Sequence, residues 1–267
     1  MKGYLSYFKT VLTSCLQYKT AALAGIFTQF FWGFLQIFIY QAFYAGVGQD
    51  TPMDFEKLVA YIWLQQAFLA FVYIRNKDES VAKSIKNGTV AYELVRPYNI
   101  YVWWFIKGIA QKFAAAALRC VPILLVAFLL PEPYNLILPS SWGSFAMFLV
   151  NLLLGTLIIT SIMMIIQTIA FFTYEDKGIS NIIFNFAELL SGISLPLPLL
   201  PKMVQTICHF FPFWLIGDLP FRIYSGDITL MASYKFLGLQ IFWIVVLVII
   251  GMLILKYAMK KVYIQGG

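Results

Sequence analysis

The stretch RNKDESVAKSIKNGTVAYELVRP, residues 75–97, decides the fold, because apolar segments long enough to cross a membrane lie on both sides of it. It is the longest polar interval in the chain and carries five basic and three acidic residues. The whole chain is 61% hydrophobic and only 12% charged. Ordinary soluble domains have about 25% charged residues. We therefore expect an all-α polytopic membrane protein that buries its apolar surface in lipid.

Two short amphipathic helices are predicted within residues 75–97, on either side of Asn87-Gly88. The first covers residues 79–86 and places Val81 and Ile85 on one face. A glycine in the left-handed conformation commonly ends a helix, which favours a break at this point. A compact, charged insert of this kind is suited to contacts outside the membrane.

Six transmembrane helices are predicted from the apolar segments of a single transmembrane domain, residues 1–267. Their expected ranges are 21–45, 57–74, 102–130, 142–172, 179–195 and 236–256. The third segment exceeds the roughly 20 residues that a span needs, so we interpret residues 98–112 as an interfacial approach with Trp103 and Trp104 in the aromatic belt.

Two further segments are apolar without being simple spans. Residues 1–20 alternate at helical spacing between apolar and polar side chains, which favours a helix in the membrane interface. The alternative is a cytosolic helix packed on another subunit. Residues 196–233 are apolar but rich in proline, which favours an extracytoplasmic re-entrant segment before the last span.

The distribution of basic residues predicts the orientation. With six spans, both termini and residues 75–97 lie on one side, which carries twelve Lys and Arg against four on the other. Because positive charge is enriched on the cytoplasmic side, we expect both termini and this stretch in the cytoplasm of a multi-pass protein of the cytoplasmic membrane. The net charge of +7 is then explained by orientation and membrane lipid, without nucleic acid.

The sequence lacks the usual chemistry of a catalytic chain. No GxxxxGK[ST] motif is present, so the chain has no phosphate-binding loop of its own. The single histidine, His209, and three widely separated cysteines make no zinc-ligand pattern. We expect neither an enzyme nor a metal site.

Two ionisable residues are predicted deep in the membrane, Arg119 in the third span and Glu188 in the fifth. A charge at the bilayer centre costs at least about 2.5 kcal/mol, so such residues usually pair or face protein or water. Two interpretations stay open. Arg119 and Glu188 pair or jointly line a translocation path, or each is satisfied separately, for example by a partner subunit.

Two local patterns resemble the permeases of type-2 ABC exporters, in particular the branch often encoded as paired permeases. The first is Ile85-x-x-Gly88-x-Val90-x-x-x-Leu94-x-Arg96-Pro97. The second is SGISLPLPLLPKMVQTICHFFPF, residues 191–213, followed by Pro220 and by YSGD at 224–227. Their order and their places among the predicted spans match the family over nearly the whole chain.

The resemblance implies a membrane subunit driven by a separate ABC ATPase. Two ATPase copies, which bind ATP and magnesium, would join this chain and a second permease protomer, identical or related. Residues 75–97 would be the cytoplasmic coupling element, and the acidic loop 174–178 a smaller contact. The residues implied in ATPase coupling are Val81, Lys83, Ile85, Lys86, Gly88, Val90, Glu93 and Arg96.

The resemblance also implies a path and a gate. Substrate would pass between the protomers near the first, second and fifth spans, and an apolar or amphipathic cargo (drug, peptide or lipid) is the preferred interpretation. The outer gate would be formed by Pro196, Pro198, Pro201 and Pro212.

The alternative function is a membrane transporter that does not use ATP, or a membrane assembly factor.

Overall fold

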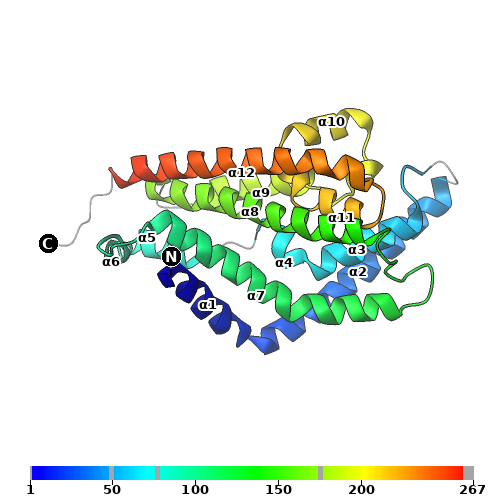
Figure 1. Ribbon diagram of the computed structural model, residues 1–267, viewed down its shortest axis with the longest axis horizontal. Helices are drawn as coiled ribbons and strands as arrows, with labels where there is room; N and C mark the ends of the chain where they lie inside the picture. Colours follow the sequence, from blue (N-terminus) through cyan, green and yellow to red (C-terminus); the bar gives the residue numbers. More distant parts are fainter. Residues whose placement is uncertain (1, 48–50, 76–78, 174–176, 261–267) are drawn as a thin grey trace.

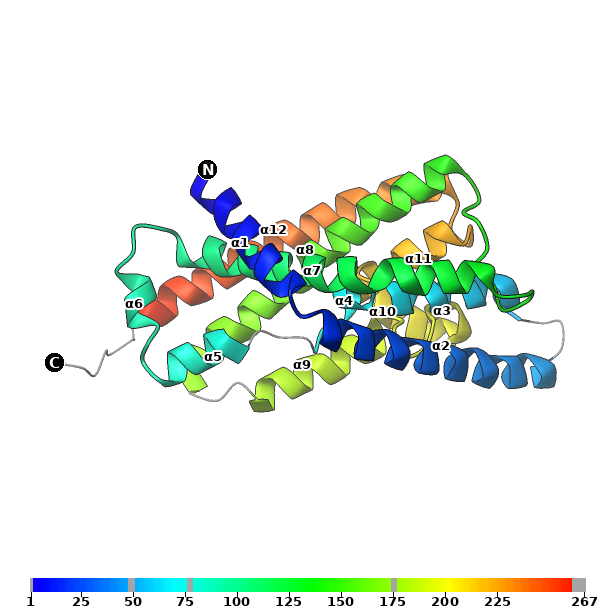
Figure 2. The same ribbon diagram turned by 90° about the horizontal axis from the view of Figure 1, so that it is seen from below.

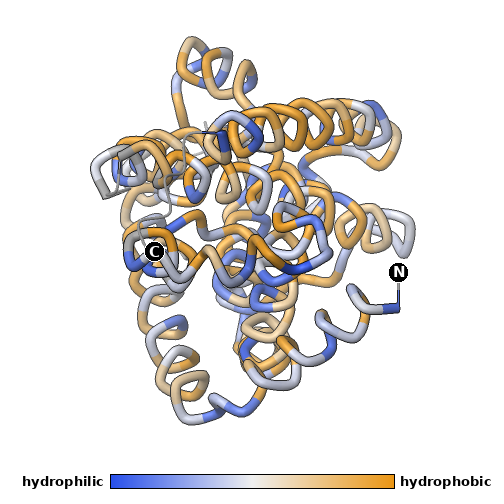
Figure 3. The backbone as a smooth tube through the Cα atoms, turned by 90° about the vertical axis from the view of Figure 1, so that its left-hand side faces the viewer, coloured by the Kyte–Doolittle hydropathy of each residue, from blue (hydrophilic) through white to orange (hydrophobic). Residues whose placement is uncertain are grey.

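The computed structural model describes residues 2–47, 51–75, 79–173 and 177–260. Every regular element in these ranges is helical, which confirms the all-α prediction (Figure 1). Hydrophobic residues extend over most of the backbone in Figure 3. The helices are α1 Lys2–Leu16, α2 Lys19–Val47, α3 Phe55–Ala67, α4 Leu69–Val72, α5 Glu79–Lys86, α6 Ala91–Leu94, α7 Ile100–Leu129, α8 Trp142–Thr173, α9 Lys177–Leu190, η1 Leu197–Leu199, α10 Lys202–Phe210, η2 Phe213–Leu215, α11 Asp218–Tyr224 and α12 Leu230–Met259.

Four of the described helices are long and apolar enough to cross a membrane. They are α2, α7, α8 and α12, and they correspond to the first, third, fourth and sixth predicted spans. All four run along the long axis of the molecule (Figure 1). Helix α7 is continuous over 30 residues and includes most of the predicted interfacial approach at residues 98–112, whose position in the membrane interface stays a prediction. A helix of that length covers about 45 Å, more than the roughly 30 Å hydrocarbon core.

The second and fifth predicted spans are shorter than expected. Helix α3 ends at Ala67, where Phe68 leaves helical geometry with φ −104° and ψ 19°, and α4 adds only four residues. Helix α9 has 14 residues and ends at Leu190. The count of six spans is therefore not confirmed, and it stays a prediction.

Helix α3 is apolar because it lies inside the protein. All its residues from Leu58 to Ala67 are buried, as expected for a helix that is hydrophobic all round. Its Trp63 ring meets the Phe34 ring of α2 edge to face at 5.1 Å, and a Cβ on Gly33 would lie 2.9 Å from the same indole. Protein contacts thus take the place of the lipid contacts that the hydropathy of residues 57–74 suggests.

Polar side chains join the helices inside this core. Gln240 of α12 donates hydrogen bonds to the carbonyl oxygens of Asn151 on α8, at 3.0 Å, and of Leu215 in η2, at 2.9 Å. Next to this point α8 carries Gly155, where a Cβ would lie 2.7 Å from the Ile216 carbonyl oxygen. The absence of a side chain at Gly155 is what lets the irregular η2 segment approach the long helices.

Helix α1 packs against α7 and crosses it in the view of Figure 2. The Tyr7 ring stacks on Trp103 with centroids 3.5 Å apart, and the Tyr4 hydroxyl accepts a hydrogen bond from the Asn99 backbone N–H at 3.2 Å. None of its residues is buried. This arrangement confirms an amphipathic N-terminal helix, while its position in the membrane interface stays a prediction.

The proline-rich segment 196–233 contains only short helices before α12 begins. Elements η1, α10, η2 and α11 gather at the end of the molecule opposite α5 and α6 (Figure 1). The C-terminal end of α12 lies near α6 (Figure 2). We call these the α5–α6 end and the α11 end. The short elements fit a non-spanning segment, and its re-entrant path in a membrane stays a prediction.

Candidate functional site

The two short helices α5 and α6 form a compact element at the end of the long helices. Gly88 between them has φ +71°, which confirms the predicted left-handed break at Asn87-Gly88. The backbone N–H of Val90 donates to the carbonyl oxygen of Ser84 at 3.1 Å and closes the turn. Ser84 Oγ in addition donates to the Val81 carbonyl oxygen at 2.8 Å. Local hydrogen bonds therefore define the turn between the two helices.

The apolar residues of this element face the protein's own interior. Val81 and Val90 are each 3% exposed and Ile85 is 8% exposed. They belong to a second hydrophobic cluster, separate from the main core, in which side chains of three long helices take part. The partners are Tyr101 and Trp104 of α7, Met164 of α8 and Leu255 of α12.

This placement changes the set of residues available to a partner protein. Burial leaves the side chains of Val81, Ile85 and Val90 no free face, so they act as anchors of the element. Glu93 also points inward, because its carboxylate accepts a hydrogen bond from Trp104 Nε1 at 2.7 Å. The prediction placed Val81, Ile85 and Val90 at an outer contact surface. In the structure these side chains instead pack against the long helices and hold the element in place.

The outward surface of the element consists of other residues. Lys83, Gly88 and Arg96 from the predicted set are exposed. Tyr92 and Val95, 74% and 83% exposed, lie beside them and were missed by the sequence analysis. Both flank the inward-facing side chains of α6 in the sequence, which is the signal that could have found them. The Lys86 side chain and loop residues 174–176 lie outside what the structure describes.

Glu188 pairs with Arg75 and not with Arg119. Arg75 Nε lies 2.8 Å from Glu188 Oε2, and the Arg75 guanidinium also donates to the Asn185 side-chain oxygen. The pairing of Glu188 with Arg119 was wrong because α9 ends at Leu190, which places Glu188 in the last helical turn with its side chain 32% exposed. The ion pair ties the segment after α4 to α9.

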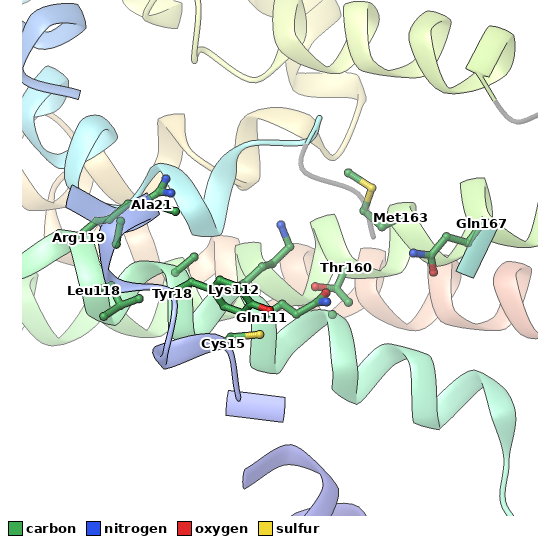
Figure 4. Close-up of a pocket in the computed structure, with 13 residues that line it drawn as sticks. Cys15, Tyr18, Ala21, Gln111, Lys112, Leu118, Arg119, Thr160, Met163 and Gln167 are labelled. Atoms are coloured by element: carbon green, nitrogen blue, oxygen red, sulfur yellow. The ribbon is translucent and has the colours of Figure 1, made fainter. Parts of the chain in front are cut away.

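Arg119 lies at a cavity of about 330 Å³ between the α1–α2 elbow, α7 and α8 (Figure 4). Lys112 lines the same cavity and is only 4% exposed. Arg119 Nε is buried without a hydrogen-bond partner among the residues described. The two cations therefore line one polar site. The sequence analysis did not predict that Lys112 and Arg119 lie at the same cavity.

A buried polar network fixes the α11 end. The Asp218 carboxylate is fully buried and accepts hydrogen bonds from Tyr61 Oη at 3.2 Å and the Leu197 N–H at 3.1 Å. Arg222 bridges Asp218 Oδ2 at 3.2 Å and Asp227 Oδ2 at 2.6 Å. This network joins α3, the start of η1 and α11.

The turn before η1 depends on glycine. Gly192 has φ +77°, and a Cβ there would lie 2.8 Å from the Asp218 Cβ. Its carbonyl oxygen lies 2.9 Å from Tyr61 Oη, so the one proton of that hydroxyl is shared between this oxygen and Asp218 Oδ1. Three of the four prolines predicted as gate residues, Pro196, Pro198 and Pro212, are buried, and Pro201 is exposed.

The described residues contain no group of three or more His, Cys, Asp or Glu that could hold a metal ion.

A family model described as "ABC-2 family transporter protein" matches residues 30–266. The chain belongs to the ABC-2 transporter family. The match includes the α5–α6 element, the long helices and the α11 end of this ABC-2 permease. No curated protein matches the sequence.

Membership assigns this ABC-2 permease to membrane transport. Its four long apolar helices agree with a multi-pass membrane component, and ABC-2 permeases are not themselves catalytic. They generally work with ATPase subunits.

Proposed function

We propose that this chain is the permease of an ATP-driven exporter and that the α5–α6 element receives the movement of a separate ATPase. The main support for this proposal is that one face of the element is exposed, while its other face packs against α7, α8 and α12. Full burial of each aliphatic anchor contributes roughly 1.5–3 kcal/mol, so displacement of the element displaces the helix ends.

The contact surface that we propose for the ATPase is the outward face, with Lys83, Gly88, Tyr92, Val95 and Arg96. Val81, Ile85, Val90 and Glu93 transmit the movement by their inward contacts. In the working complex two ATPase subunits bind ATP and magnesium, and both permease termini and the α5–α6 end face the cytoplasm. The basic residues concentrated at this end support that orientation.

The side of the molecule formed by α2 and α9 is proposed to face the second permease protomer and the substrate path. The two helices lie on the same side in Figure 2. Both helices expose large apolar side chains, which supports an apolar or amphipathic cargo. The exposed fraction of the α2 side chains named below is 48–74%. The exposed side chains are Phe27, Phe31, Phe38 and Phe43 of α2, and Ile182, Phe186 and Leu189 of α9.

The α11 end is proposed to be the extracytoplasmic gate. Pro196, Pro198, Pro201 and Pro212 shape the short elements, and the Asp218 network holds them against α3. A proton-coupled carrier, the main alternative without ATP, needs a titratable relay inside the membrane. The pairing of Glu188 with Arg75 leaves that alternative with less support.

Replacement of Gly88 tests the proposed coupling. Proline fixes φ near −65°, which is incompatible with the observed +71°, so Gly88→Pro should remove most transport-linked ATPase stimulation while the chain still inserts. Gly88→Ala is the matched control and should reduce it less, because nothing lies within 4 Å of its added Cβ and only the backbone conformation is strained. Unchanged coupling in Gly88→Pro, or an ATPase that never copurifies with the wild-type chain, would contradict the proposal.

A further inference from the structure

The cavity at the α1–α2 elbow is cationic. The side chains that line it include Lys112, Arg119, Gln111, Thr160 and Gln167 (Figure 4). No acidic residue is among the described residues that line its wall. Two positive charges therefore meet a polar cavity inside the helix bundle without a negative charge in the same described wall.

Lys112 is poorly satisfied for a buried ammonium. Its side chain has three N–H donors, and the one hydrogen bond assigned to it reaches the Ala70 carbonyl oxygen at 3.5 Å. That distance is at the limit for a hydrogen bond. A buried charge without a counter-charge is strongly unfavourable, which favours an anion beside Lys112 in the membrane.

Arg119 is held beside the same cavity by a close approach of two helices. Its guanidinium lies against Gly25 of α2, where a Cβ would be 2.8 Å from Cζ. Arg119 follows Lys112 by about two helical turns, which places both on one face of α7. Arg119 Nε lacks a hydrogen-bond partner among the described residues, so a buried donor remains for a ligand.

An apolar stripe continues from the cavity along α7. Leu118 lines the cavity, and Val121 and Leu125 follow at helical spacing with 56% and 60% exposure. At the elbow, Tyr18 also lines the cavity and is 69% exposed. The site thus combines a buried ammonium, Lys112, and a partly buried guanidinium, Arg119, with an exposed apolar surface, the arrangement that suits an anionic amphiphile.

We propose that this cavity binds the anionic headgroup of a membrane phospholipid, with the phosphate near Lys112 and Arg119 and the acyl chains along Val121 and Leu125. Basic pockets between membrane helices commonly bind anionic lipid headgroups. The lipid would fill the gap between the α1–α2 elbow and α7. This inference concerns binding by the chain alone, so it does not depend on ATP-driven export.

Native mass spectrometry of the purified full-length chain with equal amounts of phosphatidylglycerol and phosphatidylcholine tests the proposal. The wild-type chain should retain phosphatidylglycerol preferentially. Lys112→Gln with Arg119→Gln should weaken phosphatidylglycerol binding about tenfold or more, as expected for lost charge-assisted hydrogen bonds. Phosphatidylcholine binding should weaken less, because its choline cation offsets the phosphate charge, so the preference for phosphatidylglycerol should be lost. Equal binding of the two lipids by the wild-type chain would overturn the proposal.

Two control variants separate the cavity from general surface charge. Lys202→Gln with Lys235→Gln removes two exposed cations near the α11 end and should leave the preference intact. A loss as large as that of the cavity variant would overturn the proposal. Inorganic phosphate added alone distinguishes the ligand source. Full displacement of the lipid by phosphate would assign the cavity to a soluble anion and overturn the lipid assignment.

Gly25→Ala keeps both charges and serves if the double variant fails to fold. Its Cβ should push the Arg119 guanidinium aside and weaken phosphatidylglycerol binding severalfold. Gly238→Ala on α12, where nothing lies within 4 Å of the new Cβ, is the matched control and should bind as the wild type does. Identical lipid preference in both glycine variants, together with an unchanged Arg119→Gln variant, would contradict the proposed headgroup position.

Discussion

The two ends of this permease are held together by different physical means. At the α5–α6 end, two short helices are anchored by aliphatic side chains, and one ring N–H, Trp104 Nε1, bonds to Glu93. At the α11 end, a fully buried carboxylate, Asp218, joins three elements through directional hydrogen bonds and Arg222. Apolar packing tolerates small shifts of the packed groups, whereas a buried polar network loses much of its stabilisation once one partner moves.

This difference suits the proposed roles of the two ends. An element that transmits motion must remain attached while it moves, and the mainly apolar contacts of α5 and α6 with α7, α8 and α12 tolerate small shifts. A gate needs defined closed and open arrangements, and the Asp218 network can supply the closed one. The comparison therefore makes distinct predictions for substitutions at each end.

The largest effect is expected from Asp218→Ala. It removes the acceptor of the Leu197 N–H and one of the two carboxylates that pair with Arg222, and it leaves a cavity where a fully buried side chain was. Arg222 keeps Asp227 and the Tyr61 hydroxyl keeps the Gly192 carbonyl oxygen, and the remaining losses should cost about 3–5 kcal/mol of the free energy of unfolding in denaturant titrations of the purified chain. Asp54→Ala is the matched control, because Asp54 pairs with Lys57 at 2.6 Å but is 73% exposed and should change stability by about 1 kcal/mol or less. Equal losses in the two variants would remove the distinction between the ends.

A smaller and local effect is expected from Ile85→Ala. Removing this buried side chain should cost about 2–5 kcal/mol of local stability, because a cavity opens against the long helices. Hydrogen exchange should become faster for the amides of α5 and stay unchanged in α11. Lys83→Ala, on the exposed side of the same helix, should leave exchange unaltered, and faster exchange throughout the chain after Ile85→Ala would contradict a separate cluster at this end.

The sequence predicted the features that depend on neighbouring residues. The break at Asn87-Gly88 and the four long apolar helices follow from local conformation and hydropathy, and the structure confirms them. The Asp218 network was missed because its partner Tyr61 lies 157 residues away, although Asp218 and Arg222 form an i,i+4 pair in an apolar stretch. The break at Phe68 within the second predicted span was missed because hydropathy does not report a local change of backbone geometry.

The candidate site was predicted only in part, because the sequence pattern does not show what each face of a helix contacts. Val81 and Ile85 share a face, as expected, but an amphipathic pattern does not tell whether its apolar face meets the same chain or a partner. The exposed Tyr92 and Val95 became visible only when the inward face was known. Likewise, the partner of Glu188 depended on where α9 ends, which apolar composition alone left undefined.

An intermediate effect is expected from Trp104→Phe. The substitution keeps most of the packing but removes the hydrogen bond to Glu93, which should cost about 1–3 kcal/mol because the acceptor is charged. The measurement is hydrogen exchange of α6 relative to α5. Glu93→Gln keeps an acceptor and should have the weaker effect, so a stronger effect of Glu93→Gln would indicate that charge, and not this bond, holds α6.

The smallest effect on stability is expected at the half-exposed pair of Arg75 and Glu188. Solvent screens this pair, so Glu188→Gln should change the free energy of unfolding by about 1 kcal/mol or less. Transport activity should respond more strongly than stability, because the pair links the segment before α5 to α9. Arg75→Glu combined with Glu188→Arg should restore transport that either single substitution reduces, and a double variant worse than both would contradict direct pairing.

Copurification of an ATPase with surface variants of the α5–α6 element decides whether this element is the ATPase contact. Tyr92→Asp with Val95→Asp changes only exposed side chains of this end, and Met203→Asp with Phe210→Asp changes a comparably exposed apolar pair, 79% and 77%, on α10. We expect the first pair to abolish capture of the ATPase that the wild-type chain binds, and the second pair to leave capture intact. Full capture by the Tyr92 and Val95 variant would contradict the proposal that this element receives the ATPase.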